Sequence, residues 1–194
     1  MNKPNGYDEA KAFDFERERL ILGGHRCIIM KVIEKKSSTG KEQLEIHLDT
    51  APDDAQPMFF SNQFMTNGSG TWPCRVWITG YETEGSYGQR QLKAFHTAVE
   101  DSNASFFIPW GPTYADSLKG KRVGVVFGEE ENEWNGRIST LTKPRYFRSV
   151  LEVESANVPQ KKTIKPETPE KPNVTAEGFM QVQDGLEDEG LPFN

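Results

Sequence analysis

Hydrophobic and polar residues alternate along the first half of the chain in a pattern that predicts β-strands. Residues 20–35 are rich in β-branched side chains and contain the Gly23–Gly24 pair, which is typical of a bulge or bend within a strand. After a turn at 37–40, residues 43–49 predict the second arm of a hairpin. Its inner face is Leu44, Ile46 and Leu48, and its outer, solvated face is Gln43, Glu45, His47 and Asp49.

A third strand is predicted over residues 72–81, after a long connection at 51–71 for which the pattern indicates no regular structure. The two faces of this strand differ in chemistry. One face consists of Cys74, Val76 and Ile78, and the other of Arg75, Trp77, Thr79 and Tyr81.

After this strand, the spacing of the hydrophobic residues changes from a period of two to a period of 3.6 residues. Leu92, Phe95, His96 and Val99 predict an amphipathic helix of about three turns that ends at 101–103. Strands are predicted again at 121–128 and 137–153. Three strands, one helix and two strands is the order of the OB-fold, a five-stranded Greek-key barrel with a helix between strands three and four. A generic β-sandwich is the alternative, but it does not explain a single helix in that place.

The character of the chain changes at residue 155. Residues 155–178 contain four prolines, four lysines and no aromatic residue, so they cannot bury enough apolar surface to offset the entropy of ordering. We therefore predict a mainly β protein with a disordered acidic C-terminal tail. Its parts are an N-terminal extension (1–16), an OB-fold domain (17–154), a flexible Pro/Lys-rich linker (155–183) and an acidic tip (184–194).

The net charge of −6 is concentrated at the C-terminus, because residues 181–194 carry four acids and no base. The rest of the chain is nearly neutral, so its charge does not exclude a nucleic-acid partner. No run approaches the ~18 apolar residues of a membrane span, and the N-terminus lacks the apolar core of a signal peptide. We expect a cytoplasmic protein in which Cys27 and Cys74 are buried free thiols.

Motifs for catalysis are missing from the sequence: it has no P-loop, nucleophile elbow or HExxH. The acids of Glu129–Glu133 suggest a metal-dependent nuclease, but a solvated acidic turn at a hairpin tip is the simpler interpretation. The three histidines and two cysteines show no ligand spacing. We therefore expect no enzyme, no metal site and no cofactor.

Basic and aromatic residues cluster on the elements that form the oligonucleotide groove of an OB barrel, where bases stack on aromatic rings and cations follow the phosphates. The predicted single-stranded-DNA-binding residues are Lys31, Lys35, Lys36, Lys41, Arg75, Trp77, Tyr81, Trp134, Arg137, Lys143, Arg145, Tyr146, Phe147 and Arg148. Simpler roles compete with this one, because lysines at a hairpin turn are usually solvated. For Trp77 and Tyr81, the alternative is that the 51–71 connection covers their side chains.

Five blocks along residues 22–165 resemble a family of phage and prophage proteins encoded near replication and recombination genes. The blocks are "KVIEKKSSTGKEQLEIHLD", the Phe-rich segment before "WP" at 72–73, "LKAFHTAVEDSN", "LKGKRVGVVFGEEE" and "RYFRSV". The resemblance implies an OB-like fold, single-stranded-DNA binding and the cytoplasm of an infected or lysogenic bacterium. The chain departs from the family after Asn103, where relatives often have Pro-Gly.

The C-terminus resembles the acidic tip of bacterial single-stranded-DNA-binding proteins, which docks replication and repair proteins. The resemblance implies a partner-docking role for Glu187, Asp188, Glu189, Leu191, Pro192 and Phe193. Asn194 follows the Phe, so the terminal carboxylate is displaced by one residue. We expect removal of 184–194 to strengthen DNA binding or leave it unchanged, because the tip competes with phosphate for basic residues.

These patterns together predict a sequence-tolerant single-stranded-DNA-binding protein that protects strands during phage DNA replication or recombination. Replication and recombination proteins are its expected partners through the tip. An OB-like adaptor that binds a recombinase or annealing protein, with little DNA affinity of its own, is the main alternative. The sequence leaves open whether two copies pair as a homodimer and whether RNA binds as well as DNA.

Overall fold

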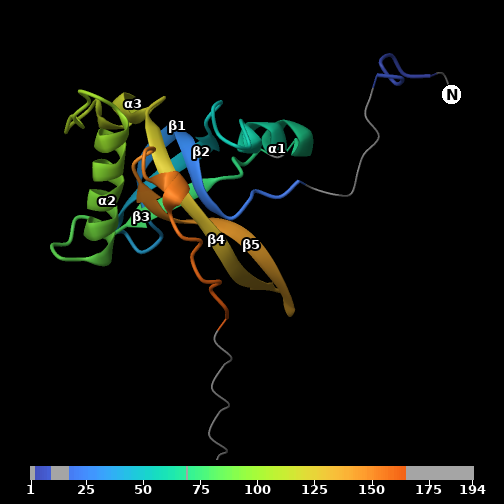
Figure 1. Ribbon diagram of the computed structural model, residues 1–194. Coiled ribbons are helices and arrows are strands. Elements are labelled where there is room, and N and C mark those ends of the chain that lie inside the picture. The colour runs from blue at the N-terminus through green and yellow to red at the C-terminus, as the bar shows by residue number, and fades with distance from the viewer. Residues whose placement is uncertain (1–2, 10–17, 69, 165–194) are drawn as a thin grey trace, which may run out of the picture. The chain divides into compact units, whose positions relative to one another are not determined.

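The structure, a computed structural model, describes residues 3–9, 18–68 and 70–164. A five-stranded antiparallel sheet with the spatial order β3-β2-β1-β4-β5 forms its centre (Figure 1). The strands are β1 (Gly23–Lys36), β2 (Glu42–Thr50), β3 (Arg75–Thr79), β4 (Arg122–Trp134) and β5 (Arg137–Arg148). The prediction of a mainly β chain with five strands is confirmed.

Helices occur at more places than predicted. Helix α1 (Phe59–Asn67) lies between β2 and β3, and both α2 (Tyr87–Ser102) and α3 (Tyr114–Leu118) lie between β3 and β4. A short 3₁₀ helix, η1 (Val153–Ser155), follows β5. The predicted amphipathic helix corresponds to α2, whose start is fixed by the Ser86 hydroxyl, which accepts a hydrogen bond from the N–H of Gln89 at 3.0 Å. The expectation of one helix was therefore wrong, and the sheet does not close, because β3 and β5 are its two edges.

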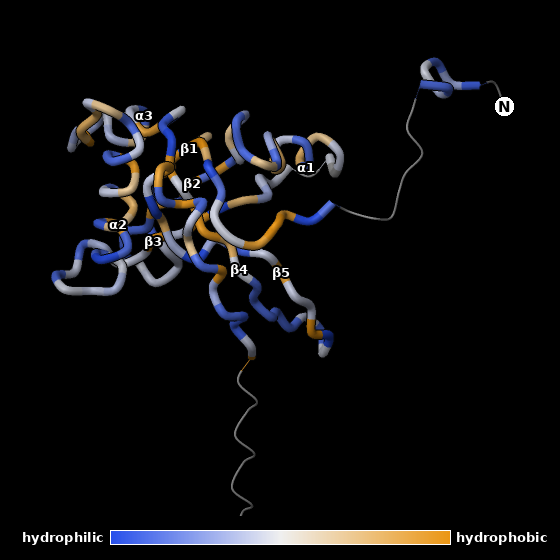
Figure 2. The backbone as a smooth tube through the Cα atoms, in the orientation of Figure 1, coloured by the Kyte–Doolittle hydropathy of each residue, from blue (hydrophilic) through white to orange (hydrophobic). Residues whose placement is uncertain are grey.

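The core lies on the face of the sheet that the alternation pattern predicted. Leu44 pairs with Ile78 and Ile46 with Val76 across β2 and β3, so the inner side chains of neighbouring strands meet on one face. In Figure 2 the hydrophobic segments run through the sheet. The largest fully buried side chains include Phe95, Phe127, Ile29, Leu48, Val123 and Val125.

The outer face of β2 differs from the prediction, because Glu45 and Asp49 are buried rather than solvated. The Asp49 carboxylate accepts hydrogen bonds from the N–H groups of Phe60 at 2.9 Å and Ser61 at 3.2 Å, and from the Ser61 hydroxyl. Asp49 therefore caps the first turn of α1 from a distant strand. Met58, the residue before α1, offers no side-chain cap, which is why the local sequence did not indicate a helix.

Strand β1 contains a bulge, but not at its glycine pair. The register shifts between Ile29 and Lys31, so that Ile29 and Val32, three residues apart, both point into the core. Gly24 has a packing role instead. A Cβ at this position would lie 1.7 Å from the carbonyl oxygen of Val153, so only glycine lets η1 pack against the sheet.

The chain continues along the sheet after η1. Lys162 donates its backbone N–H to the carbonyl of Glu129 at 3.0 Å and accepts from the N–H of Glu131 at 2.9 Å. The compact unit that contains the sheet reaches Thr163. The predicted acidic tip, 184–194, lies outside the described residues. Cys27 and Cys74 are buried free cysteines, as expected, and no helix in the described part of the chain is long and apolar enough to cross a membrane.

Candidate nucleic-acid interface

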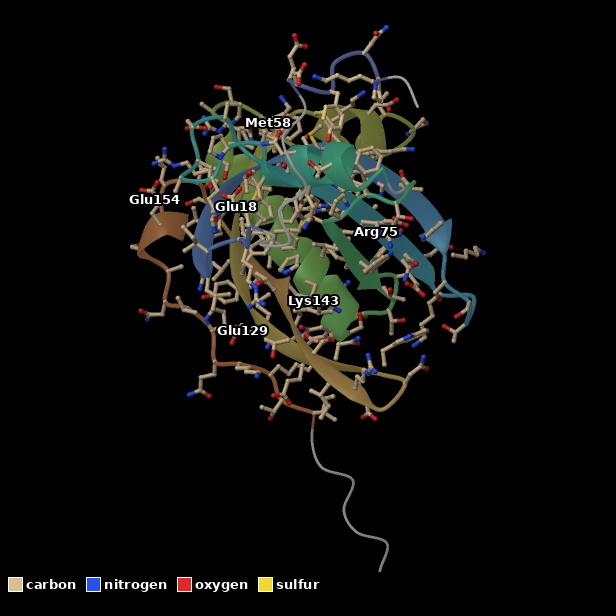
Figure 3. All side chains as sticks on the ribbon, turned by 90° about the vertical axis from the view of Figure 1, so that its right-hand side faces the viewer. Glu18, Met58, Arg75, Glu129, Lys143 and Glu154 are labelled. Carbon is tan, nitrogen blue, oxygen red and sulfur yellow. The ribbon has the colours of Figure 1, made fainter. Side chains whose placement is uncertain are left out.

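A groove of about 940 Å³ lies between the two edge strands, β3 and β5. Figure 3 views the molecule from this side. One wall is Arg75 and Trp77 of β3, and the other is residues 140–144 of β5. Helix α1 adds apolar and polar side chains, and the segment 18–22 completes the rim; these contribute Phe59, Phe60, Gln63, Glu18, Arg19, Leu20 and Leu22.

Trp77 is the aromatic side chain on which a ligand in this groove would stack. It is 44% exposed because it stands on the face of β3 opposite the core, at the position that pairs with Glu45. The guanidinium carbon of Arg75 lies 5.0 Å from the centroid of the Trp77 ring, within the range of a cation–π contact. An exposed ring beside a guanidinium group suits a flat, anionic ligand such as a nucleotide.

The position of Arg75 depends on the buried carboxylate of Glu45. Glu45 accepts hydrogen bonds from Lys35 and, at 2.9 Å, from His47, and lies 3.5 Å from the Arg75 guanidinium. Burial alone would raise the pKa of Glu45, but the hydrogen bonds from Lys35 and His47 outweigh it and hold the pKa at about 2. Glu45 is therefore ionised at neutral pH and fixes Arg75 beside Trp77.

The facing wall contributes Lys143, which has no carboxylate oxygen within 4.0 Å among residues 3–9, 18–68 and 70–164. The groove as a whole is only weakly basic. Three cations line it, Arg19, Arg75 and Lys143, against two carboxylates, Glu18 and Glu129. Its three cationic groups therefore stand apart, Arg75 and Lys143 on the two walls and Arg19 on the rim, and do not form a continuous positive surface.

The β4–β5 hairpin extends past the start of β1, where Gly23, the first residue of β1, pairs with Phe127 of β4 (Figure 1). We call residues 128–143 the arm. Directly opposite residues of an antiparallel pair share a face, and the arm's register sorts its charges accordingly. One face carries Trp134, Arg137, Leu141 and Lys143, and the other carries Glu129, Glu131 and Glu133.

The acidic stretch thus lies within β4, and the expectation that it forms the hairpin tip was wrong; the turn is Asn135–Gly136. Glu130 is the one acid on the basic face. It pairs with Arg145 at 2.9 Å and with Lys162 at 3.6 Å. In the described part of the chain, no three His, Cys, Asp or Glu residues are grouped so as to hold a metal ion.

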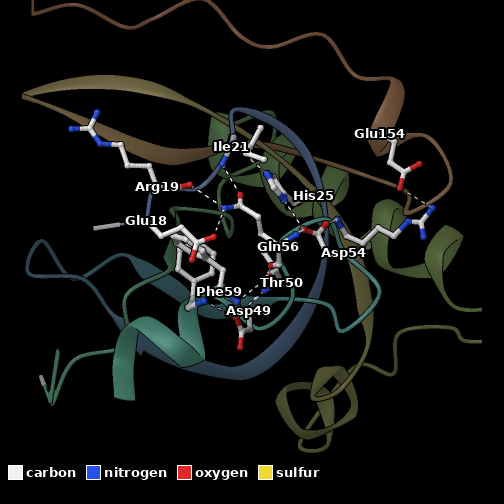
Figure 4. A network of polar contacts seen from close by, with 12 residues as sticks. Glu18, Arg19, Ile21, His25, Asp49, Thr50, Asp54, Gln56, Phe59 and Glu154 are labelled. Carbon is white, nitrogen blue, oxygen red and sulfur yellow. Dashed lines mark hydrogen bonds and ion pairs between the residues drawn. The ribbon is translucent and has the colours of Figure 1, made fainter. Parts of the chain in front are cut away.

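A polar network fixes the segment 18–22 at the rim (Figure 4). The Gln56 side chain accepts from the N–H of Ile21 at 2.7 Å and donates to the carbonyl of Arg19 and the carboxylate of Glu18, both at 3.0 Å. His25 reaches the same segment, because its Nε2 lies 2.8 Å from the carbonyl oxygen of Ile21.

The buried His25 is held as an imidazolium. Its Nδ1 lies 2.8 Å from an oxygen of Asp54, which is also buried. Both ring nitrogens therefore face oxygens that accept, and both must donate. Burial lowers the pKa of His25, but the hydrogen bonds to Asp54 and to the Ile21 carbonyl together raise the pKa by more. The net change in the pKa is therefore upward.

Three of the predicted residues line the groove, and six others lie on the arm, on the sheet face that carries Trp77, or at the β1–β2 turn. Arg75, Trp77 and Lys143 line the groove, and Trp134 and Arg137 lie on the basic face of the arm. Lys31 and Lys35 share the face of Arg75 and Trp77, since Lys31 pairs with His47 and His47 with Arg75. Lys36 and Lys41 flank the turn between β1 and β2, where Lys36 lies 3.6 Å from Glu42.

The other predicted residues do not line the groove. Phe147 packs against the core ring of Phe95, with centroids 5.0 Å apart, and Tyr81 also packs against the core. Arg145 is engaged by Glu130. Tyr146 donates its hydroxyl to the carbonyl of Asn157 at 3.1 Å, and Arg148 lies over the Tyr146 ring at 5.4 Å.

Sequence reasoning missed Arg19, Gln63 and Leu141 as groove residues. They come from three segments far apart in the chain, and no local pattern brings them together. A comparison of the sequence with models of known protein families and with curated proteins finds no match.

Proposed function

We propose that this chain is a single-stranded-DNA-binding protein that holds its ligand, with little sequence preference, in the groove between β3 and β5. The observation that carries the proposal is the exposed Trp77 ring, with Arg75 fixed beside it. On the facing wall stands Lys143, which has no carboxylate partner in the part of the chain that the structure describes. Base stacking on aromatic rings contributes ~1–3 kcal/mol per base and tolerates every base, because each has a π-face.

The topology supports an OB-like architecture. Strands β4, β1, β2 and β3 lie side by side in that order, which is the arrangement of a Greek key. An OB barrel is a five-stranded, partly open Greek key, and its ligands bind on the face of strands two and three and on the loops that join strands one to two and four to five. On this proposal, the groove wall at β3 and the arm are the elements of this chain that would correspond to those binding elements.

The weak positive charge of the groove gives the proposal a quantitative consequence. Each lysine or arginine that contacts a phosphate releases a counterion, and affinity for single strands falls with salt by a logarithmic slope of roughly 0.7 per contact. With Arg19, Arg75, Lys143 and the arm's Arg137 as candidate contacts, we expect a shallow salt dependence. The resemblance of the sequence to phage proteins supports a role in replication or recombination, with the tip recruiting partners.

An adaptor that binds a protein remains the second candidate, because two carboxylates share the groove with its three cations. Charge reversal of Lys143 and Arg137 separates the two functions. A DNA-binding protein loses its affinity for single strands in this double variant. An adaptor retains its partner and shows little DNA affinity with or without the change.

Titration of a fluorescent dT oligonucleotide at low and at physiological salt tests the proposal, with duplex DNA and RNA of the same length alongside. We expect saturable binding of dT that weakens with salt, and weaker binding of duplex, whose bases are not free to stack. The absence of dT binding at low salt would contradict the proposal.

A further inference from the structure

The connection between α2 and α3 exposes two large aromatic side chains. Phe107 is 80% exposed and Trp110 is 75% exposed. We call residues 104–115 the aromatic loop. Neither side chain lines the groove, and fully burying such side chains removes 150–250 Å² of surface each. Their exposure therefore leaves a substantial apolar surface in water.

The loop is firmly anchored, so this exposure does not come from a loose segment. Between the two exposed rings, Ile108 is buried and its N–H donates to a carboxylate oxygen of Glu100 at 3.0 Å. The preceding Phe106 packs on the core, with the Lys121 ammonium 4.1 Å from its ring centroid. Ser105 adopts a φ of 60°, a conformation that costs energy in a residue with a Cβ and persists where packing holds it.

Trp110 is held from beneath. Its ring stacks on Tyr114, with centroids 6.0 Å apart and an interplanar angle of 10°, and meets the edge of His96 at 5.2 Å. Tyr114 and His96 are themselves joined by a 2.7 Å hydrogen bond between the hydroxyl and Nε2. A rigid aromatic side chain loses little entropy when a partner covers it, which is a property of interface hot spots.

The amino-acid composition of the aromatic loop limits the kinds of partner that can contact it. Residues 104–115 contain no charged side chain, so the loop itself offers no cation to a phosphate backbone. A surface without charge is also compatible with itself, because no like charges oppose each other when two copies meet. We propose that the aromatic loop is the contact between two copies of this chain in a homodimer.

The spacing of the two rings fits two-fold symmetry. In such an interface, residue i of one copy contacts residue j of the other, and j contacts i. Phe107 of each copy can therefore meet Trp110 of the other, which gives two equivalent aromatic contacts. The four rings would bury roughly 600 Å², a third to a half of the 1,200–2,000 Å² typical of a stable interface, so the proposed dimer is a weak one.

Pairing through this loop leaves the groove accessible. In Figure 1 the yellow-green connection between α2 and α3 lies on the left, on the side away from α1. Figure 3, which faces the opposite side, shows the groove residues Arg75 and Lys143. The inference therefore goes beyond the proposed function and does not depend on it.

Sedimentation velocity of the full chain without nucleic acid tests the proposal over roughly 1–100 µM. We expect a mass of twice 22.0 kDa at the upper end of the range. Phe107→Glu should give a monomer throughout, because it would place two charges in an apolar contact. Trp110→Ala should weaken the dimer by roughly 30-fold or more, the loss that defines a hot spot. The matched control is Leu151→Glu, an equally exposed apolar residue outside the loop, which should remain dimeric.

Two results would overturn the proposal. One is a wild-type chain that sediments as a monomer up to the highest concentration. The other is a Phe107→Glu variant that remains dimeric. A circular dichroism melt of each variant shows whether loss of the dimer reflects loss of the fold; because Phe107 points into solvent, we expect an unchanged melting temperature for the monomeric form.

Discussion

Trp77 depends on its neighbours for the geometry that we assign to it. The ring stands at the groove because β3 alternates, and Arg75 stays beside it because the Glu45 carboxylate, buried and ionised, holds the guanidinium at 3.5 Å. A residue-level account of binding therefore includes Glu45 as a positioning residue, although it does not reach the ligand.

Replacement of Trp77 by Ala tests the stacking surface. We expect the affinity for dT to fall about 5- to 150-fold, the equivalent of ~1–3 kcal/mol for one stacked base. Fluorescence anisotropy measures the effect. A thermal melt of the variant measures the separate loss of packing, because more than half of Trp77 is covered. Tyr87→Ala is the matched control, since Tyr87 is exposed but lies outside the groove, and an equal loss in both variants would count against stacking at Trp77.

His25 makes stability depend on pH. Its pKa is raised in the folded state, so its contribution is complete below the unfolded value of about 6.5 and is lost as pH rises through the folded value. His96, with a folded pKa lowered to about 4 by burial, opposes this trend near pH 6.5, where its unfolded form is still partly protonated. We expect the contribution of His25 to the urea midpoint to decrease as the pH rises above 6.5.

The matched variant for this measurement is His25→Gln, which does not titrate. Its urea midpoint should lie below the wild-type value at pH 6.5, and the difference between the two midpoints should shrink as the pH rises. A variant with the same pH dependence as the wild type would contradict the assignment of an imidazolium paired with Asp54.

At the scale of elements, helix α1 depends on a side chain ten residues before its first residue, Phe59. Asp49→Ala removes the acceptor for the backbone N–H groups of Thr50, Phe60 and Ser61 and for the Ser61 hydroxyl. We expect a loss of about 2 kcal/mol or more in the free energy of unfolding, measured by urea denaturation. Asp101→Ala, at an exposed position in α2, should change it by less than about 0.5 kcal/mol; equal effects of the two would mean that Asp49 does not cap α1.

The basic face of the arm gives a prediction about salt dependence. Lys143→Gln should weaken dT binding and reduce the logarithmic salt slope by roughly 0.7, as expected for the loss of one phosphate contact with a single strand. Lys119→Gln, an exposed lysine outside the groove, should leave the slope unchanged. An unaltered slope for Lys143→Gln would exclude Lys143 as a phosphate contact.

Elements with a local signal were predictable from the sequence, and those with a distant cause were not. Alternation identified the two faces of β3, so Arg75 and Trp77 were assigned to the non-core face before the structure placed them there. The cap of α1 comes from β2, and the short α3 has too few residues to show a periodic pattern, so both helices were missed. The buried side chain of Glu45 looked solvated because its partners Lys35, His47 and Arg75 lie on three different strands.

At the scale of the whole molecule, the groove itself had no signature in the sequence. It exists because β3 and β5, separated by α2, α3 and β4, end as the two edges of one sheet, and because the segment 18–22 is fastened to the rim through Gln56 and His25. The basic clusters indicated a nucleic-acid partner, but only the register of β4 with β5 separates the arm's cations from its glutamates. Phe147 and Tyr81 illustrate the same limit, since aromatic residues of the core and of a binding surface look alike in a sequence.

Photochemical cross-linking tests the central claim most directly, because it reports where the ligand lies. An oligonucleotide of 5-iododeoxyuridine is bound to the full chain, irradiated and digested, and the attached peptide is identified by mass spectrometry. We predict that the main cross-link is at Trp77 and that Lys143→Glu reduces its yield. Cross-links confined to Trp110 or other aromatic residues outside the groove would contradict the assignment of the groove between β3 and β5 as the binding site.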